Sequence, residues 1–441
     1  MLKIAYHTLG CKVNQYDTQA MEELLVSAGY RTVPFPGEAD VYLINTCTVT
    51  GTGDKKSLQL ARRLKREHPQ SKLILTGCLA QLKGSQLMQY GADLVVGTQF
   101  RSEIVSLLKR VITSGEPYCA VAPLPENITY EPLYVHRFED HTRAILKIQE
   151  GCRNRCTYCI IPAVRGPIRS RLPEDIRKEA QSLAAAGFRE IVLTGIHLSS
   201  YGKDLSPASS LLDALQILEE TDGILRIRLG SLEPGIATRV FAESLSKLTK
   251  ICPQFHLALQ SGSDSVLRRM RRQYLSASYL GAVANLREYF PHAAFTTDIL
   301  TGFPGETEDE FRETLDFIRK VGFSRIHVFP YSPRPGTPAA AMGGQLSETV
   351  KQQRCRELIA AGRELSQCYQ RQWIGRSAVL LPEEKTDGCW EGYTPEYLRI
   401  RLNPEAVCSA GVPVSVIIQD STPLFLRGVI NNSDNGGVVN G

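Results

Sequence analysis

The chain has 441 residues, more than one compact domain usually holds, so two or three domains are expected. Its hydrophobic fraction of 43% is ordinary for a globular protein, and no stretch approaches the ~18 consecutive apolar residues of a membrane span. Twelve cysteines are too sparse for a disulfide framework, and a net charge of +5 permits nucleic-acid binding without demanding it. Residues 1–4 form a strand-like run rather than a signal peptide, so a cytoplasmic protein with no membrane partner is expected.

The first region, residues 1–113, alternates short β-rich runs with helix-like segments. Helices are expected over 15–28 and 52–68. This alternation predicts a parallel α/β sheet. The following segment, 114–137, has four prolines between residues 117 and 132 and little periodicity, which indicates a linker.

Three cysteines of the first region share one placement. Cys11, Cys47 and Cys78 each come just after a β-rich run. The carboxyl ends of parallel strands meet at one edge of a sheet, so these thiols are expected to converge on a three-thiolate site. The alternative is that each cysteine is a small apolar core residue.

A second alternation fills residues 138–370. A helix is expected over 347–372, and six strands are expected at 144–148, 190–194, 225–229, 255–259, 295–300 and 325–329. Six βα repeats predict a partial (β/α)6 barrel. Such a barrel carries its reactive face at the carboxyl ends of the strands.

The loop after the first of these strands carries Cys152, Cys156 and Cys159 in the spacing Cys-x3-Cys-x2-Cys. A four-iron cluster normally takes four thiolates, so three leave one iron open to another ligand, which indicates chemistry rather than structure. A structural zinc site needs four ligands, and Thr157 and Tyr158 are poor candidates. Three unrelated buried cysteines are the remaining alternative.

Polar or small residues end the strands that follow. Residues of this kind at strand ends are suited to a cofactor and substrate pocket, and the candidates are Gly195, Ser231, Glu233, Gln260 and Ser261. Basic residues lie beside the cysteine loop at Arg165, Arg169 and Arg171, and again over 268–272. We expect these arginines to contact a phosphate or a ligand carboxylate, the alternative being solvated surface.

The pattern changes after the long helix. Over 371–432 it predicts a small β-barrel, with strands at 377–381, 397–402, 412–419 and 425–430. The last residues, 433–441, are rich in Asn and Gly and are expected to be disordered.

The cysteine loop and its neighbours resemble the radical S-adenosylmethionine (SAM) superfamily. That resemblance implies SAM on the open iron, with Tyr158 near the adenine and the segment at Gly195 near the SAM amino group. Both cysteine triads together resemble the methylthiotransferases over nearly the whole chain. The family-like segments outside the cysteine loop are 9–15, 45–49, 76–78, 260–263 and 302–307.

Within that family the chain is most similar to the tRNA threonylcarbamoyladenosine branch, on residues 10–16, 160–167 and 327–332. The resemblance implies an enzyme that converts N6-threonylcarbamoyladenosine at tRNA position 37 into its 2-methylthio derivative. It implies two [4Fe–4S] clusters, one on each triad, and two SAM molecules per turnover. The implied partners are the tRNA anticodon loop, an electron donor such as a flavodoxin or ferredoxin, and a sulfur donor that the sequence does not identify.

The resemblance also gives some segments more specific roles. The C-terminal barrel is similar to the RNA-binding TRAM domain, a plain structural barrel being the alternative. Arg165, Arg169 and Arg171 are the candidates to bind the carboxylate of the threonylcarbamoyl group. Rival functions are methylthiolation of isopentenyladenosine, modification of a ribosomal protein, or a non-enzymatic iron–sulfur RNA-binding sensor. The six βα repeats oppose the sensor, which needs no SAM pocket.

Overall fold

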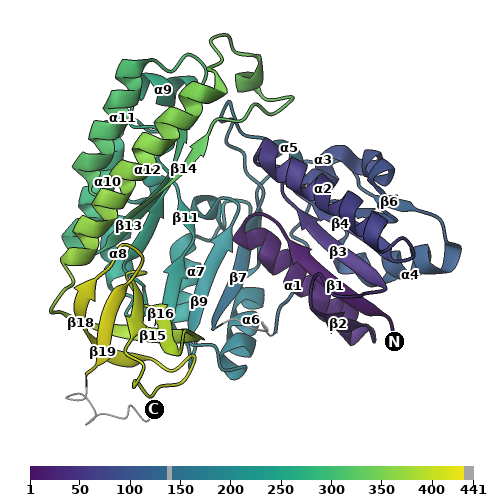
Figure 1. The fold of residues 1–441 in the computed structure, drawn as a ribbon, viewed down its shortest axis with the longest axis horizontal. Helices are drawn as coiled ribbons and strands as arrows, with labels where there is room; N and C mark the ends of the chain where they lie inside the picture. The colour runs from purple at the N-terminus through teal and green to yellow at the C-terminus, as the bar shows by residue number, and fades with distance from the viewer. Residues whose placement is uncertain (137–141, 432–441) are drawn as a thin grey trace.

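The computed structural model describes residues 1–136 and 142–431, and it has three structural units in chain order (Figure 1). A parallel α/β sheet comes first, then a curved set of parallel strands with helices outside it, and last a closed β-barrel. The predicted α/β fold class and the predicted barrel are therefore confirmed. The tail predicted to be disordered lies outside the described residues.

The N-terminal sheet has the strand order β2-β1-β3-β4-β5-β6, and every pairing in it is parallel. Apolar clusters cover both of its faces, so its central strands read as continuous hydrophobic runs. Its strands are β1 (Lys3–Thr8), β2 (Arg31–Val33), β3 (Val41–Thr46), β4 (Lys72–Gly77), β5 (Leu94–Val96) and β6 (Tyr118–Ala120). Its helices are α1 (Lys12–Ser27), α2 (Gly51–Glu67), α3 (Cys78–Lys83) and α4 (Ile104–Ser114), with 3-10 turns η1 (Gly84–Tyr90) and η2 (Arg101–Glu103).

One strand of this sheet lies in the segment that was predicted to be a linker. Strand β6 pairs with β5 in the register Leu94↔Tyr118 and forms the edge of the sheet. A three-residue edge strand bordered by proline-rich sequence has no detectable period, and only its pairing partner makes it a strand. The sheet therefore extends beyond residue 113.

The central unit contains all six predicted strands, arranged as two four-stranded sheets that meet where β10 passes into β11. The sheet orders are β10-β9-β7-β8 and β11-β12-β13-β14, and only β8 is antiparallel to its neighbour. The strands are β7 (Arg143–Glu150), β8 (Arg169–Ser170), β9 (Glu190–Gly195), β10 (Arg226–Leu229), β11 (Ser231–Leu232), β12 (Gln254–Leu257), β13 (Ala294–Thr301) and β14 (Arg325–Pro330).

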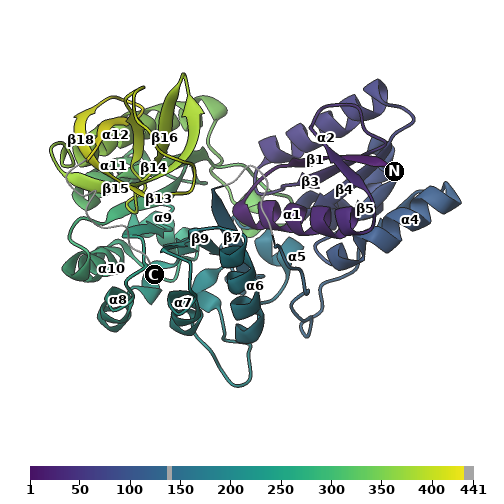
Figure 2. The same ribbon diagram turned by 90° about the horizontal axis from the view of Figure 1, so that it is seen from below.

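Helices cover the outer side of these strands, and Figure 2 shows α6, α7, α8 and α10 in a row there. The large core cluster between strands and helices is built from Leu, Ile, Val and Phe side chains. The helices are α5 (Ile161–Arg165), α6 (Pro173–Ala185), α7 (Leu211–Glu219), α8 (Arg239–Ser246), α9 (Asp264–Arg269), α10 (Ser276–Tyr289), α11 (Glu308–Val321) and α12 (Glu348–Arg371), with 3-10 turns η3 (Leu198–Ser200), η4 (Pro234–Ile236) and η5 (Pro338–Ala341).

The C-terminal barrel closes in the order β15-β16-β17-β19-β18 around a small apolar core. Strand β16 was not predicted, because Glu391 interrupts its apolar pattern. That carboxylate is buried and forms ion pairs with Arg399 and Arg401. The strands are β15 (Ser377–Thr386), β16 (Cys389–Tyr393), β17 (Arg399–Leu402), β18 (Val414–Ser421) and β19 (Leu426–Ile430).

The barrel is docked against the amino ends of the central strands. Arg226 and Arg228, on β10, donate to backbone carbonyls of Val379 (2.8 Å) and Pro395 (2.8 Å). Arg143, the first residue of β7, pairs with Glu383 at 2.7 Å. The barrel therefore lies at the opposite end of β7 from the cysteine loop. No helix within residues 1–136 and 142–431 is long and apolar enough to cross a membrane.

Candidate active site

The cysteine loop leaves the carboxyl end of β7 through Gly151. This glycine has φ +73°, and a Cβ built on it would lie 1.8 Å from the carbonyl oxygen of Pro167, so only glycine fits. The amide of Cys152 donates to Gly166 (3.0 Å), and the amide of Thr157 donates to Met270 (3.0 Å). The loop is thereby fixed from both sides at the strand ends.

Cys152, Cys156 and Cys159, hereafter the radical triad, line a cavity of about 150 Å³. Three of the predicted pocket residues, Tyr158, Ser231 and Glu233, line the same cavity, and so do Asn154, His197 and Arg272. Arg272 and Asn154 were not predicted to be pocket residues. Asn154 lies inside the cysteine loop itself, so its position was a usable signal, whereas Arg272 lay in a run of arginines with nothing to single it out.

The other three predicted pocket residues do not appear among those that line this cavity. Gly195 packs against Gln149, with room for no Cβ, although Ile196 and His197 next to it do line the cavity. Ser261 is buried and bonds Thr314 at 3.2 Å. Gln260 forms a β-bridge to Ile299. Their contact with a cofactor stays a prediction.

A charged pair forms one wall of the cavity. Arg272 donates to Glu233 (2.7 Å) and to the Cys156 sulfur (3.2 Å), and His197 lies 3.6 Å from the same carboxylate. Burial by itself raises the pKa of Glu233, but His197 and Arg272 outweigh it and hold that pKa below its usual value. The cavity thus presents an ionised carboxylate beside the three thiols.

The rest of the 268–272 run lies outside the cavity. Arg268 and Arg271 are exposed, and Arg269 pairs with Glu310 at 2.7 Å. Phosphate contact by this run stays a prediction.

The thiols of the radical triad fit a metal cluster better than a core. Burial raises the pKa of Cys152 to about 11 and that of Cys159 to about 12, and the Cys156 thiol adds to both. Such thiols ionise only with a compensating cation, as metal ligation provides. Among the described residues no three His, Cys, Asp or Glu side chains are placed to hold a single metal ion. An iron–sulfur cluster offers each thiolate a different iron, so its ligands surround a volume rather than one point.

Cys11, Cys47 and Cys78, hereafter the N-terminal triad, lie at the carboxyl edge of the neighbouring strands β1, β3 and β4. Cys11 precedes α1 and Cys78 begins α3. Gly10 has φ +107°, and a Cβ on it would lie 2.8 Å from the Cys47 Cβ, so glycine lets the two loops touch. Burial raises the pKa of Cys78 to about 12, with Arg165 opposing the rise and both other triad thiols adding to it. The three thiols therefore converge at one edge of the sheet, as predicted.

Comparison with known proteins decides the family. Residues 146–318 match the radical SAM superfamily, and residues 3–97 match the uncharacterized protein family UPF0004. A protein of Bacillus subtilis named threonylcarbamoyladenosine tRNA methylthiotransferase MtaB is 44% identical over 91% of this chain and 90% of its own. A Thermotoga maritima protein of the same name is 37% identical, over 90% of this chain and 91% of its own. This chain belongs to the radical SAM methylthiotransferase family.

Other relatives carry a different name. A protein of Pelotomaculum thermopropionicum named tRNA-2-methylthio-N(6)-dimethylallyladenosine synthase is 36% identical over 98% of both chains. A solved structure of the radical SAM methyltransferase TsrM from Kitasatospora setae shares the fold, with a TM-score of 0.58 at 14% identity over 77% of this chain and 74% of that one. The predicted family is confirmed: this methylthiotransferase is an enzyme that uses SAM and a [4Fe–4S] cluster.

The arginines predicted to bind substrate are buried inside this methylthiotransferase, and their binding of a substrate stays a prediction. Arg165, Arg169 and Arg171 are each at most 2% exposed. Arg165 pairs with Asp17 and Glu150, and Arg171 pairs with Glu179. Arg165 and Arg171 are thus neutralised by carboxylates of the protein itself, whereas Nη1 of Arg169 has no hydrogen-bond partner among the described residues.

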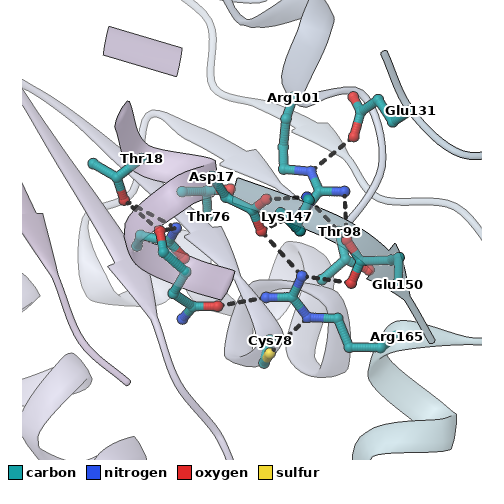
Figure 3. Close-up of polar contacts among 12 residues, drawn as sticks. Asp17, Thr18, Thr76, Cys78, Thr98, Arg101, Glu131, Lys147, Glu150 and Arg165 are labelled. Atoms are coloured by element: carbon teal, nitrogen blue, oxygen red, sulfur yellow. Dashed lines mark hydrogen bonds and ion pairs between the residues drawn. The ribbon is translucent and has the colours of Figure 1, made fainter. Parts of the chain in front are cut away.

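The pairing of Arg165 belongs to an ionic cluster between the first two structural units (Figure 3). Asp17 on α1 and Glu150 on β7 lie among three cations, and Glu131 borders the group. The cations are Arg101, Lys147 and Arg165, so three positive charges meet three carboxylates. We name this set, Asp17, Arg101, Glu131, Lys147, Glu150 and Arg165, the interface cluster.

Proposed function

We propose that this methylthiotransferase converts N6-threonylcarbamoyladenosine at tRNA position 37 into its 2-methylthio derivative, in the cytoplasm. The observation that carries this proposal is the name shared by full-length relatives at 44% and 37% identity. The alternative, isopentenyladenosine at the same position, is favoured by the relative at 36% identity with the dimethylallyl name.

The radical triad is proposed to hold the cluster that binds SAM. When bound and reduced, that cluster would supply the electron for SAM cleavage and so the radical that removes hydrogen from adenine C2. Glu233 and Arg272 lie in the same cavity, 2.7 Å apart. A fixed ion pair of this kind orients a zwitterionic amino acid such as the methionine part of SAM. Tyr158 and Ser231 line the cavity as further contacts.

The N-terminal triad is proposed to hold a second [4Fe–4S] cluster. Three thiols on adjacent strand ends, with no fourth cysteine among the family-like segments around them, match the open-iron arrangement of the radical triad. When bound, this cluster would supply the sulfur that is inserted, one SAM would supply the methyl group and a second would supply the radical. An electron donor such as a flavodoxin or ferredoxin is needed to reduce the clusters.

The anticodon loop of tRNA is the proposed substrate, because a base there leaves its stack at little cost. The barrel is proposed to bind a part of the tRNA that is distant from the base that reacts. It docks at the amino end of β7, and the radical triad follows the carboxyl end. Eight strand residues at ~3.3 Å each separate the two ends by about 25 Å. A tRNA that contacts both the barrel and the radical triad would therefore be bound through more than its anticodon loop.

Nucleoside mass spectrometry tests the proposal. Transfer RNA from cells that lack this protein should carry threonylcarbamoyladenosine without the methylthio group, and expression of the protein should restore the methylthio derivative. Purified reconstituted enzyme should then act on tRNA bearing the threonylcarbamoyl group. Action on isopentenyl tRNA alone would overturn the substrate and leave the family standing. Absence of SAM cleavage by the reduced protein would instead favour an iron–sulfur RNA-binding sensor.

A further inference from the structure

One side chain of the interface cluster also contacts a cysteine of the N-terminal triad. Arg165 ends α5, which follows the radical triad along the chain. Its Nε donates to the Cys78 sulfur at 3.2 Å, across 87 residues of sequence. Figure 3 shows the guanidinium between Cys78 and the carboxylates of Asp17 and Glu150. A residue of the central unit thus donates to a proposed ligand of the N-terminal unit.

The remaining donors of Arg165 fix this orientation. Nη1 donates to Asp17 (3.0 Å) and to Glu150 (2.8 Å), and Nη2 donates to the side-chain oxygen of Asn14. Arg165 is fully buried, and apolar contacts of Cys78 with Ile160 and Val164 close the same interface. A planar guanidinium held at three corners cannot turn away from the sulfur, and a lysine cannot reproduce the fork.

The same arrangement occurs at the radical triad. Arg272 donates to the Cys156 sulfur at 3.2 Å and is anchored by Glu233. Each triad therefore has one arginine donating to one thiol. Donors to ligand sulfurs and nearby positive charge stabilise the reduced, more negative form of an iron–sulfur cluster and raise its reduction potential.

We propose that Arg165 is a positioning residue of the sulfur-inserting site, which fixes the Cys78 thiolate and raises the reduction potential of the cluster on the N-terminal triad. The proposal rests on the proposed function, which places a cluster there. Arg165 also connects the two triads, because its partner Glu150 lies two residues before Cys152 of the radical triad.

The test uses full-length protein in which the radical triad is changed to alanine, so that the N-terminal cluster alone gives a signal. Arg165→Lys is compared with Arg101→Lys in this background. Arg101 contacts the same two carboxylates, and among the described contacts it reaches no cysteine. Midpoint potentials are measured by redox titration with electron paramagnetic resonance detection, and iron is counted in parallel.

We expect Arg165→Lys to move the midpoint to a more negative potential and Arg101→Lys to leave it within the scatter of replicates. An unchanged midpoint in Arg165→Lys, or an equal shift in both variants, overturns the proposal. Arg165→Lys could also bind no iron at all. In that case the proposal is supported if Arg101→Lys loses as much thermal stability but keeps its iron. It is overturned if both variants lose their iron. A parent that holds no iron refutes the second cluster itself, which is a failure of the proposed function.

Discussion

Changing Asp17 to asparagine should lower the free energy of unfolding more than a substitution on the surface does, because it weakens the contact between the N-terminal unit and the central unit. Asp17 is 1% exposed and contacts Arg101, Lys147 and Arg165. Removing one partner of a buried ion pair costs about 3–5 kcal/mol, because the remaining charge stays buried without compensation. Glu150 still contacts all three cations, at 3.3, 3.2 and 2.8 Å, so the lower end applies. About 3 kcal/mol corresponds to roughly a hundredfold larger unfolded population.

The assay is urea unfolding of anaerobic protein, followed by far-UV circular dichroism and by tryptophan fluorescence. Both tryptophans, Trp373 and Trp390, pack in the barrel core, so fluorescence reports that unit and should not change. Glu131→Gln is the matched control. Glu131 belongs to the interface cluster but pairs with Arg101 alone among its cations, so its loss should cost about 1–2 kcal/mol. An Asp17→Asn effect within 0.5 kcal/mol of wild type, or equal to that of the control, would refute the reasoning.

Four further results are expected. Reconstituted protein should hold about eight irons and about four after the radical triad is changed to alanine; loss of all iron would contradict two separate sites. Alanine at the N-terminal triad should leave reductive SAM cleavage intact and abolish methylthiolation, and loss of cleavage with the radical cluster present would contradict that division. Deleting residues 377–441 should weaken tRNA binding and its salt dependence, with SAM cleavage retained, as filter binding would measure; unchanged binding would make the barrel structural. Burial alone raises the pKa of Asp17 and Glu150, but the interface cations hold both pKa values below their usual values. The stability that the two carboxylates contribute is therefore complete above pH 4.5 and is lost as the pH falls through their folded-state pKa values. In Asp17→Asn the free energy of unfolding should depend less on pH in that range.

Local patterns carried much of the fold. The six central strands were predicted correctly because each is a short run rich in apolar residues, although only some of them, such as β7 and β9, are almost wholly buried and β14 is not. Helix α1 was predicted to begin at residue 15, and it begins at Lys12 instead. Cys11, a residue expected to serve as a ligand, stands at its N-cap without a side-chain capping bond, so no capping signal marked the boundary.

The cysteine loop was predictable for a related reason, because its three thiols are seven residues apart at most and share one loop. By contrast, the N-terminal triad could be proposed only through strand order. Its members meet because β1, β3 and β4 are neighbours in one sheet. A different strand order with the same sequence pattern would have kept them apart.

The sequence by itself therefore determined the family, the order of the structural units and the cysteines that hold metal in the proposal. Only the tertiary structure decided what the arginines do. Arg165 and Arg272 lie in basic runs, and nothing in the sequence distinguishes them from the other arginines there. Arg165 contacts a thiol at 3.2 Å that is 87 residues away in the sequence, and Arg272 contacts one at 3.2 Å that is 116 residues away. A side chain's periodicity indicates whether it faces a core, whereas its charge partner is set by which distant elements the fold brings beside it. The neutralisation of buried charge is a property of that assembly rather than of any local stretch.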